Sequence, residues 1–344
     1  MKITASDRAE LARLLARFSG QRILVLADLV ADEYIYGEIA RVSREAPVLI
    51  LKQRERQIVP GGGGNAANNL LELGAEVVLA GAVGADEPGA ALVGYFRYKG
   101  LSTRHILRLP GYQTPTKSRL LGGLSHWQRQ QIVRLDREPA EPLKRAARAR
   151  LVRSLLPLVP KARALLVSDY GYGAADPSDL RPLLRRAARR GLVTTLDSRF
   201  HLLRYSGFTA ATPNEPELEE AFGAKVGNDP SALERLGRRA LERMKLRALL
   251  ATRGRDGMVL FEPASPAGGR GRKPAWLPIF GSEEAVDVTG AGDTVIAAFT
   301  LALAARADFF HAAQIANSAA GLAVMKRGTA TVKASEIAEA IRNA

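Results

Sequence analysis

Residues 287–294 read Asp-Val-Thr-Gly-Ala-Gly-Asp-Thr and run directly into a predominantly apolar stretch over residues 295–305. This pattern predicts a glycine turn that opens a buried helix, with a carboxylate in the first helical turn. Glycines let backbone N–H groups converge on one point, and the positive end of the helix dipole faces the same point. An anion would bind there, and Asp293 could accept the proton of an attacking hydroxyl. A core helix capped by Thr and Asp explains the same residues without a ligand, so both interpretations stay open at this step.

The composition narrows the possible chemistry. The chain has 344 residues, 47% of them hydrophobic, which suits one large α/β unit with an insertion. It contains no cysteine, and this excludes disulfides, thiolate metal sites and cysteine nucleophiles. The four histidines show no metal-ligand spacing, and neither a serine nucleophile elbow nor a phosphate-loop lysine motif occurs.

The net charge of +15 raises nucleic acid as a partner, because clustered Lys and Arg bind phosphates. The arginines, however, fall in separate helical patterns around residues 144–153, 181–190 and 235–243, where Leu and Ala recur at core spacing. Solvated helix faces explain them, so we expect no nucleic-acid partner. The N-terminus lacks the pattern of a signal peptide, and the longest apolar run is shorter than the roughly 20 residues of a membrane span. We therefore expect a cytoplasmic protein without a membrane partner.

Strand-like runs alternate with amphipathic helical runs along the chain. This alternation is typical of parallel βαβ units whose helices cover both faces of a sheet. We predict an α/β fold with a doubly wound, mostly parallel sheet. The predicted strands lie at residues 23–27, 77–80, 164–168, 193–196 and 249–252.

Two stretches break this rhythm, at approximately residues 33–60 and 101–136, and both are rich in strand-forming residues. They predict a small second sheet, built from two excursions of the chain, that serves as a lid.

Polar residues gather at the predicted carboxyl edge of the sheet, where open α/β sheets bind ligands. Asp28 and Asp32 flank the end of the first strand, and a carboxylate there could hold two vicinal hydroxyls of a sugar. Residues 60–65 read Pro-Gly-Gly-Gly-Gly-Asn and lead into a helix with Asn68 and Asn69, whose amides also suit sugar hydroxyls. Turn-forming Asp and an Asn-capped helix explain both motifs equally well.

Two further motifs suit a nucleotide. Asn214 and Glu217 lie three residues apart, so a helix that starts there would place both on one face, near Mg²⁺ and phosphates. The same pair is also a variant of the capping box. Residues 252–257 read Thr-Arg-Gly-Arg-Asp-Gly, which predicts a glycine turn after a strand, beside a nucleotide or in an ordinary hairpin.

Taken in order, these motifs resemble those of the ribokinase-like (PfkB) sugar kinases. Within that family the resemblance is greatest to the heptose 7-phosphate kinase branch, whose members are bifunctional and also carry a heptose 1-phosphate adenylyltransferase half. The resemblance covers nearly the whole chain and implies a single ribokinase-like kinase domain over residues 1–344. It rests on residues 32–37, 41–48, 60–75, 116–119, 130–136, 168–170, 212–215, 252–257 and 287–293.

The resemblance implies a phosphotransferase that uses ATP and Mg²⁺ on a sugar hydroxyl, most specifically the anomeric hydroxyl of D-glycero-D-manno-heptose 7-phosphate. It makes Asp293 the base and the N–H groups of Gly290, Ala291 and Gly292 the anion hole. We expect the helix N-terminus to keep Asp293 ionised. The substrate-binding residues that it implies are Asp32, Gly62, Asn65, Lys117, Arg119 and Arg134, of which the last three would meet the substrate phosphate from the lid. The implied nucleotide-binding residues are Asn214, Glu217, Thr252, Gly254, Gly257 and Asn317, with Glu217 near Mg²⁺ through water.

Family lids often form dimer contacts, so we also expect a homodimer through the lid. The sequence has no His-x-Gly-His motif for nucleotidyl transfer, and a separate adenylyltransferase would act downstream. Departures from the heptose branch leave the acceptor open: Tyr172 replaces a Lys, Ser198 a Pro and Ala27 a Gly, and residues 122–128 lengthen the lid. The alternatives are a kinase for another sugar or sugar phosphate and a non-catalytic sugar or nucleotide sensor.

Overall fold

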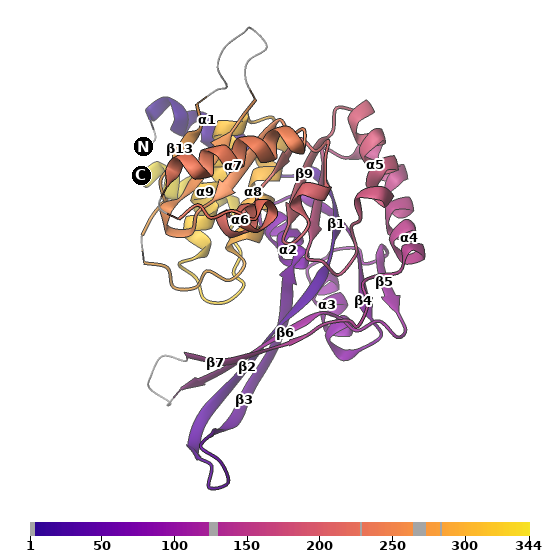
Figure 1. The fold of residues 1–344 in the computed structure, drawn as a ribbon, viewed down its shortest axis with the longest axis vertical. Helices are drawn as coiled ribbons and strands as arrows, with labels where there is room; N and C mark the ends of the chain where they lie inside the picture. The colour runs from indigo at the N-terminus through magenta and orange to yellow at the C-terminus, as the bar shows by residue number, and fades with distance from the viewer. Residues whose placement is uncertain (1–3, 124–129, 228, 264–272, 283) are drawn as a thin grey trace.

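The computed structural model describes residues 4–123, 130–227, 229–263, 273–282 and 284–344, which form a large sheet flanked by helices and a smaller sheet that projects from this body (Figure 1). The strands are β1 (Arg22–Ala27), β2 (Leu29–Val42), β3 (Leu49–Gly62), β4 (Glu76–Gly84), β5 (Ile106–Leu109), β6 (Thr116–Gly123), β7 (Gln130–Arg137), β8 (Ala164–Asp169), β9 (Val193–Ser198), β10 (Ala210–Ala211), β11 (Ala248–Thr252), β12 (Met258–Phe261) and β13 (Ala275–Leu277). The helices are α1 (Ala5–Ala16), α2 (Gly63–Glu72), α3 (Glu87–Tyr98), α4 (Arg145–Leu155), α5 (Pro177–Arg189), α6 (Glu215–Phe222), α7 (Pro230–Arg243), α8 (Ala291–Ala304), α9 (Phe309–Ala323) and α10 (Ala334–Asn343), with short 3₁₀ helices η1 (Leu156–Lys161), η2 (Leu202–Arg204) and η3 (Gly254–Asp256).

The larger sheet has the order β13-β12-β11-β10-β9-β8-β1-β4-β5. Its strands are parallel from β11 to β5, and only β12 and β13 are antiparallel to their neighbours. All five predicted strands belong to it, and the predicted doubly wound α/β fold is confirmed. The parallel strands bring their carboxyl ends, and the loops that follow them, to one edge of the sheet.

Each face of this sheet has its own hydrophobic core. On β1, the side chains of Ile23, Val25 and Ala27 belong to one cluster and those of Leu24 and Leu26 to the other. Alternate residues of a strand point to opposite faces, so a continuous apolar run fills both cores. The first cluster includes residues of α1, α2, α3, α8, α9 and α10, and the second includes residues of α4, α5, α6 and α7.

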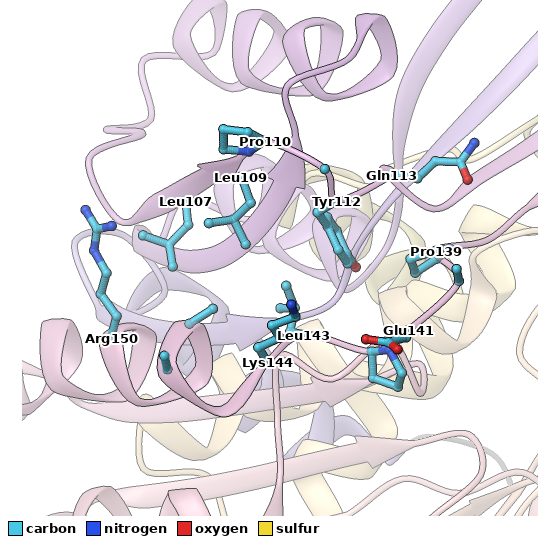
Figure 2. A pocket seen from close by; sticks show the side chains of 15 residues that line it. Leu107, Leu109, Pro110, Tyr112, Gln113, Pro139, Glu141, Leu143, Lys144 and Arg150 are labelled. Carbon is cyan, nitrogen blue, oxygen red and sulfur yellow. The ribbon is translucent and has the colours of Figure 1, made fainter.

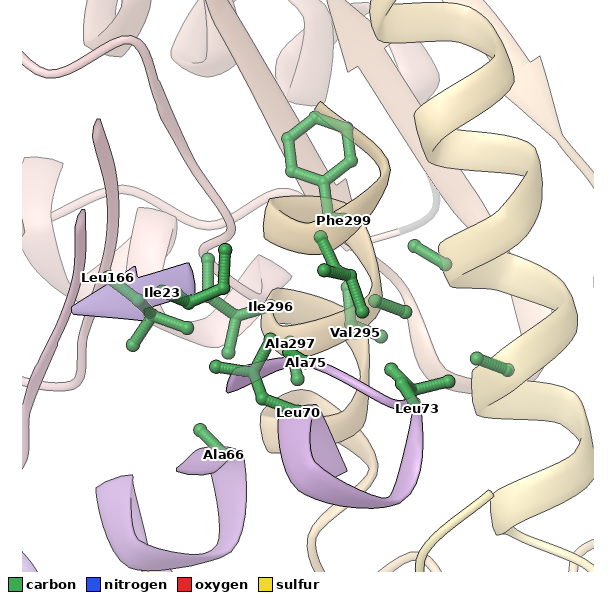
Figure 3. Packing of buried hydrophobic residues seen from close by; sticks show 14 of the residues in the cluster. Ile23, Ala66, Leu70, Leu73, Ala75, Leu166, Val295, Ile296, Ala297 and Phe299 are labelled. Atoms are coloured by element: carbon green, nitrogen blue, oxygen red, sulfur yellow. The ribbon is translucent and has the colours of Figure 1, made fainter. Parts of the chain in front are cut away.

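Helix α8 lies at the centre of the first core. Every residue from 293 to 304 on it is buried. Its side chains Val295, Ile296 and Phe299 pack beside Leu70 of α2 and Ile23 of β1 (Figure 3). This burial explains why the stretch after Asp293 is apolar on nearly all sides, and it anchors α8 in the core while its first residues, Ala291 and Gly292, remain accessible.

The smaller sheet has the order β3-β2-β6-β7 and extends away from the body of the molecule (Figure 1). Strand β2 pairs antiparallel with β3 and parallel with β6, and β7 pairs antiparallel with β6. Its strands come from the two excursions in the sequence, although β5, in the second excursion, joins the larger sheet. Residues 124–129 of the predicted lid lie outside the described residues. Among the helices that the structure describes, none is both long and apolar enough to cross a membrane.

Candidate active site

The turn before α8 is built by glycine and not by a capping side chain. Gly290 is the N-cap residue of α8 and has a φ of 79°. No side chain caps this end of the helix. A Cβ at Gly290 would lie 2.5 Å from Nδ2 of Asn65. Asp287 instead folds the preceding loop, because its carboxylate accepts hydrogen bonds from the backbone N–H groups of Thr289 and Gly328, each at 2.9 Å. The capped-helix interpretation of this stretch is therefore wrong. One predicted anion-hole donor, the N–H of Ala291, is directed at the carbonyl of Val288 at 3.2 Å.

Asp293, in the first turn of α8, is buried with 3% of its surface exposed. One carboxylate oxygen accepts a hydrogen bond from Nδ2 of Asn65 and the other accepts one from the hydroxyl of Tyr170, both at 2.9 Å. The predicted base and one predicted sugar-binding residue are thus in direct contact, although 228 residues separate them. Tyr170 was not among the predicted site residues.

The expectation that Asp293 stays ionised is wrong for the free protein. Burial raises the pKa of Asp293 to about 8, and the nearby carboxylates of Asp197 and Asp32 raise it further, while the hydrogen bonds from Asn65 and Tyr170 oppose the shift. Desolvation outweighs the helix dipole here because the carboxylate is enclosed by the protein. Asp293 can therefore hold or release a proton near neutral pH.

A chain of amide side chains supports this carboxylate from α2. Nδ2 of Asn69 donates to the backbone carbonyl of Asn65 at 3.0 Å, and Oδ1 of Asn69 accepts from the hydroxyl of Thr294 at 3.1 Å. Helix α2 begins within the glycine run, where a Cβ at Gly63 would lie 2.4 Å from the Cβ of Ala27. The glycines therefore let α2 approach β1 closely enough for Asn65 to reach Asp293.

Asp32, at the base of the lid on β2, is buried and already paired. Its carboxylate accepts from Nη1 of Arg119 at 2.8 Å and from the hydroxyl of Thr329 at 3.1 Å. A Cβ at Gly61 would lie 2.6 Å from the Asp32 carboxylate carbon, so this glycine makes room for it. The predicted sugar-binding Asp32 and the predicted phosphate-binding Arg119 are therefore joined as an ion pair in the free protein.

Asp28 has a different role from Asp32. Its carboxylate, 2% exposed, accepts three backbone N–H groups, from Tyr170, Tyr172 and Ala174, at 2.7–3.0 Å. Burial raises the pKa of Asp28 to about 6, against the effect of these hydrogen bonds. Asp28 shapes the loop after β8 and is not open to a sugar. That loop carries Tyr170, and the Ser-Asp-Tyr motif was the only signal in the sequence that could have pointed to it.

The two remaining cations of the lid, Arg134 and Lys117, differ in whether a carboxylate pairs with them. Arg134 on β7 forms a two-point ion pair with Asp136, at 2.9 and 3.1 Å. Lys117 on β6 is half-buried, and its ammonium lies 5.6 Å from the centre of the Tyr170 ring. Among the residues that the structure describes, Lys117 has no carboxylate within ion-pair distance. Burial and the guanidinium of Arg199 lower its pKa.

The predicted nucleotide-binding residues meet on the other side of Asp293. Thr252, Gly254, Gly257 and Asn317 line a cavity of about 200 Å³. Ala291 and Gly292 line the same cavity, so it opens onto the glycine turn. Most of its other lining residues are apolar, namely Met258, Ile279, Ala285, Val288, Val295, Ala320 and Val324. An aromatic base suits such walls.

Asn214 and Glu217 form the capping box of α6, with reciprocal hydrogen bonds of 2.8 and 2.9 Å. Asn214 also bridges to Thr252 and, with it, lines a second cavity of about 470 Å³ beside the first. Burial raises the pKa of Glu217 to about 7, and burial together with Glu217 and Asp169 raises the pKa of Asp197. Asp197, which the motifs did not single out, thus shares this acidic corner.

A larger cavity of about 740 Å³ lies between β5 and α4 (Figure 2). Leu107, Leu109 and Tyr112 face Leu143 across it. None of the predicted site residues lines it, and its walls are mainly apolar. Size alone does not make it the active site, since the polar and acidic groups converge on Asp293 instead.

Comparisons with known proteins show which family the chain resembles. The family model described as pfkB family carbohydrate kinase matches residues 25–336. The protein named Bifunctional protein HldE in Geobacter sulfurreducens is 38% identical over 96% of this chain and 65% of its own length. The protein of the same name in Coxiella burnetii is 36% identical over 95% of this chain and 65% of its own length. The chain thus spans about two-thirds of the length of these curated relatives.

Solved structures share the fold at lower identity. The structure of Arabidopsis thaliana ribokinase complexed with ribose and ATP has a TM-score of 0.69 and 19% identity, covering 94% of this chain and 99% of that one. The structure of Escherichia coli phosphofructokinase-2 in complex with substrates and products has a TM-score of 0.70 and 16% identity, with the same coverage of 94% and 99%.

Proposed function

The chain belongs to the pfkB family of carbohydrate kinases, which transfer a phosphoryl group to a sugar hydroxyl, and from this membership we propose a specific reaction. The γ-phosphate of ATP moves to the anomeric hydroxyl of D-glycero-D-manno-heptose 7-phosphate. The observation that carries the proposal is the position of Asp293. Its carboxylate contacts Asn65 on the acceptor side, and the glycine turn before it lines the apolar cavity on the nucleotide side. The curated relatives named HldE support a heptose acceptor.

The proposed chemistry is an in-line displacement. The anomeric O–H donates its proton to a carboxylate oxygen of Asp293 while its oxygen bonds to the γ-phosphorus. The bond from that phosphorus to the bridging oxygen breaks, and ADP leaves with the electron pair. The transition state of such a transfer is loose, so the proton moves late and a modest base suffices. Asp293 must be deprotonated to accept it, and the acidic limb of the pH profile reports that requirement.

Mg²⁺ fits the acidic corner formed by Glu217 and Asp197. Among the described residues no group of three or more His, Cys, Asp or Glu side chains could hold a metal by itself. Mg²⁺ at kinase sites is held by one or two carboxylates with phosphate oxygens and water, so two carboxylates are a suitable donor set. When bound, Mg²⁺ would neutralise phosphate charge. Glu217 and Asp197 would then be held ionised, with pKa values below those of the free protein.

The lid supports two further parts of the proposal. Lys117 would meet the 7-phosphate of the acceptor, because it is a half-buried ammonium beside the ring of Tyr170, whose hydroxyl bonds Asp293. Arg119 and Arg134 would join it if their ion pairs with Asp32 and Asp136 rearranged as substrate entered. Val133 and Leu135 on β7 are 48% and 59% exposed, an apolar surface suited to a homodimer through the lid.

The base role is tested with Asp293→Asn. We expect kcat with ATP and heptose 7-phosphate to fall at least about 10³-fold, while calorimetry shows ATP binding retained. Asp308→Asn is the matched control. Asp308 caps α9 through the N–H of His311 at 2.8 Å, and asparagine caps helices equally well. Turnover near that of the wild-type protein in Asp293→Asn would contradict the proposal.

One observation favours a second candidate, a kinase for a plain sugar. Arg119 and Arg134 are both engaged by carboxylates within the lid, which leaves fewer cations for a substrate phosphate. A screen of ADP release with heptose 7-phosphate, its unphosphorylated sugar, ribose and fructose separates the two. Preference for the phosphorylated heptose, lost in Lys117→Gln, supports the first candidate, and preference for a plain sugar supports the second.

A further inference from the structure

We propose that Tyr170 is a positioning residue for Asp293, whose hydroxyl orients the base and stabilises its ionised form. The proposal rests on the proposed function, in which Asp293 accepts the proton of the acceptor. The hydroxyl of Tyr170 donates to one carboxylate oxygen of Asp293 at 2.9 Å, and the amide of Asn65 donates to the other at the same distance. Both donors are neutral, and no cation bonds this carboxylate among the described residues. Tyr170 is therefore one of two groups that offset its burial.

The ring of Tyr170 is held from several sides, so that its hydroxyl points at Asp293. Its backbone N–H donates to Asp28 at 2.9 Å. The ammonium of Lys117 lies 5.6 Å from the ring centre, and a Cβ at Gly62 would lie 3.3 Å from two atoms of the ring. Gly62, with a φ of 52°, thus leaves the space that the ring needs. A side chain fixed in this way before substrate binds can position a base without reorganising.

The charged groups around this pair act in both directions. Besides burial, Asp197 and Asp32 raise the pKa of Asp293, and Asp293, Asp197 and Glu217 raise that of Tyr170, whereas Lys117 brings a positive charge to the face of the ring. The pKa of Tyr170 is also raised by burial, so its hydroxyl keeps its proton and remains a donor throughout the neutral range. Removal of this hydroxyl should therefore make Asp293 harder to ionise.

The test is the pH profile of kcat/KM for Tyr170→Phe, with ATP and heptose 7-phosphate, over pH 5.5 to 10. A hydrogen bond to a charged group contributes enough to shift a pKa by about one unit. We expect the acidic limb to move up by about one pH unit, with a roughly tenfold loss below the limb and recovery toward the wild-type value above it. Phenylalanine keeps the ring against Lys117 and Gly62.

Tyr172→Phe is the matched control, because it removes a hydroxyl from the same loop that bonds Glu138 at 2.9 Å. Its acidic limb should coincide with that of the wild-type protein. The proposal is overturned if Tyr170→Phe loses activity equally at every pH, or if both variants shift the limb by the same amount. Asp293→Asn distinguishes a failure of the proposed function from a failure of the role of Tyr170. If Asp293→Asn retains turnover, the proposed function has failed. If it is inactive while the acidic limb of Tyr170→Phe stays at the wild-type pH, only the role of Tyr170 has failed.

A readout without turnover accompanies these assays. In thermal unfolding, stability should fall more steeply between pH 7 and 9 in Tyr170→Phe than in Tyr172→Phe, since the ionised Asp293 has lost a donor. Equal slopes in the two variants would contradict the proposal even if neither turned over substrate.

Discussion

At the scale of the single residue, burial of Asp293 makes the stability of the folded protein depend on pH. Its pKa is raised to about 8 in the folded protein, above the ordinary value near 3.8 of an unfolded chain. The folded protein therefore binds the proton more tightly than the unfolded chain between these two values. Stability contributed by this proton is present at low pH and is lost as the pH rises toward 8.

Asp293→Asn should remove this dependence. We expect its free energy of unfolding to vary less between pH 5 and 8.5 than that of the wild-type protein, by about 1–3 kcal/mol over that range. Denaturant unfolding at several pH values measures the difference. Asp28 and Glu217, whose pKa values are also raised, leave a remaining slope in both proteins. Parallel curves for the two proteins would mean that Asp293 titrates normally.

At the same scale, Gly290 and Gly292 should differ in how much a substitution by alanine destabilises the protein. Gly290→Ala meets both a positive φ of 79° and a contact of 2.5 Å with Asn65, whereas a Cβ at Gly292 has nothing within 4 Å. We expect Gly290→Ala to lower the free energy of unfolding by about 2–4 kcal/mol and Gly292→Ala to leave it within about 1 kcal/mol. Chemical denaturation compares the two variants. Equal losses of unfolding free energy in the two variants would contradict this prediction.

The lid is the element in which charge pairs can be compared directly. Glu33 on β2 is buried and accepts hydrogen bonds from Ser118 and from Arg56, the latter at 2.6 Å. Burial opposes ionisation, yet these bonds hold the pKa of Glu33 below its ordinary value. Further along the same two strands, Glu38 pairs with Arg54 at 2.5 Å, with both side chains exposed. The two pairs thus differ in the exposure of the carboxylate and in its partners, because Glu33 also accepts from Ser118 and Arg137.

We expect Glu33→Gln to lower the free energy of unfolding by about 1–3 kcal/mol and Glu38→Gln by at most about 0.5 kcal/mol. The reason is that Glu33 is the buried partner, and its carboxylate would lose charge-assisted hydrogen bonds that water does not replace, whereas Glu38 and Arg54 are exposed and become resolvated. Urea unfolding provides the comparison, and KM for the acceptor should rise only in Glu33→Gln. A larger loss in Glu38→Gln would contradict this ranking.

Patterns within single elements were readable from the sequence, whereas contacts between distant elements were not. The apolar run of β1 predicted a strand buried on both faces, and the glycine turn predicted the mouth of α8. The motif at residues 168–170 includes Tyr170, but nothing in it shows that the hydroxyl of this residue reaches Asp293 on α8. The protonation of Asp293 was mispredicted for the same physical reason: it depends on enclosure by segments near residues 32, 65, 170 and 197, which only the fold assembles.

At the scale of the whole molecule, the exposed apolar surface of the lid leads to a prediction about the oligomeric state. Val133 and Leu135 lie two residues apart on β7 and therefore on one face. If the lid forms a dimer, the double variant Val133→Lys/Leu135→Lys should be a monomer in analytical ultracentrifugation at concentrations where the wild-type protein is a dimer. Tyr98→Lys is the control, since Tyr98 on α3 is 89% exposed and lies outside the lid. A wild-type protein that sediments as a monomer would contradict the proposed dimer.

The burial of α8 also affects how fast its backbone amide hydrogens exchange with water. A helix enclosed on every side exchanges its amide hydrogens only when a large part of the protein opens, whereas strands that project from the body exchange through small local openings. We therefore expect the proposed base to lie on one of the slowest-exchanging parts of the molecule and the proposed acceptor-side cations on one of the fastest. The lid strands can therefore open and close around a ligand without any rearrangement of the core around Asp293.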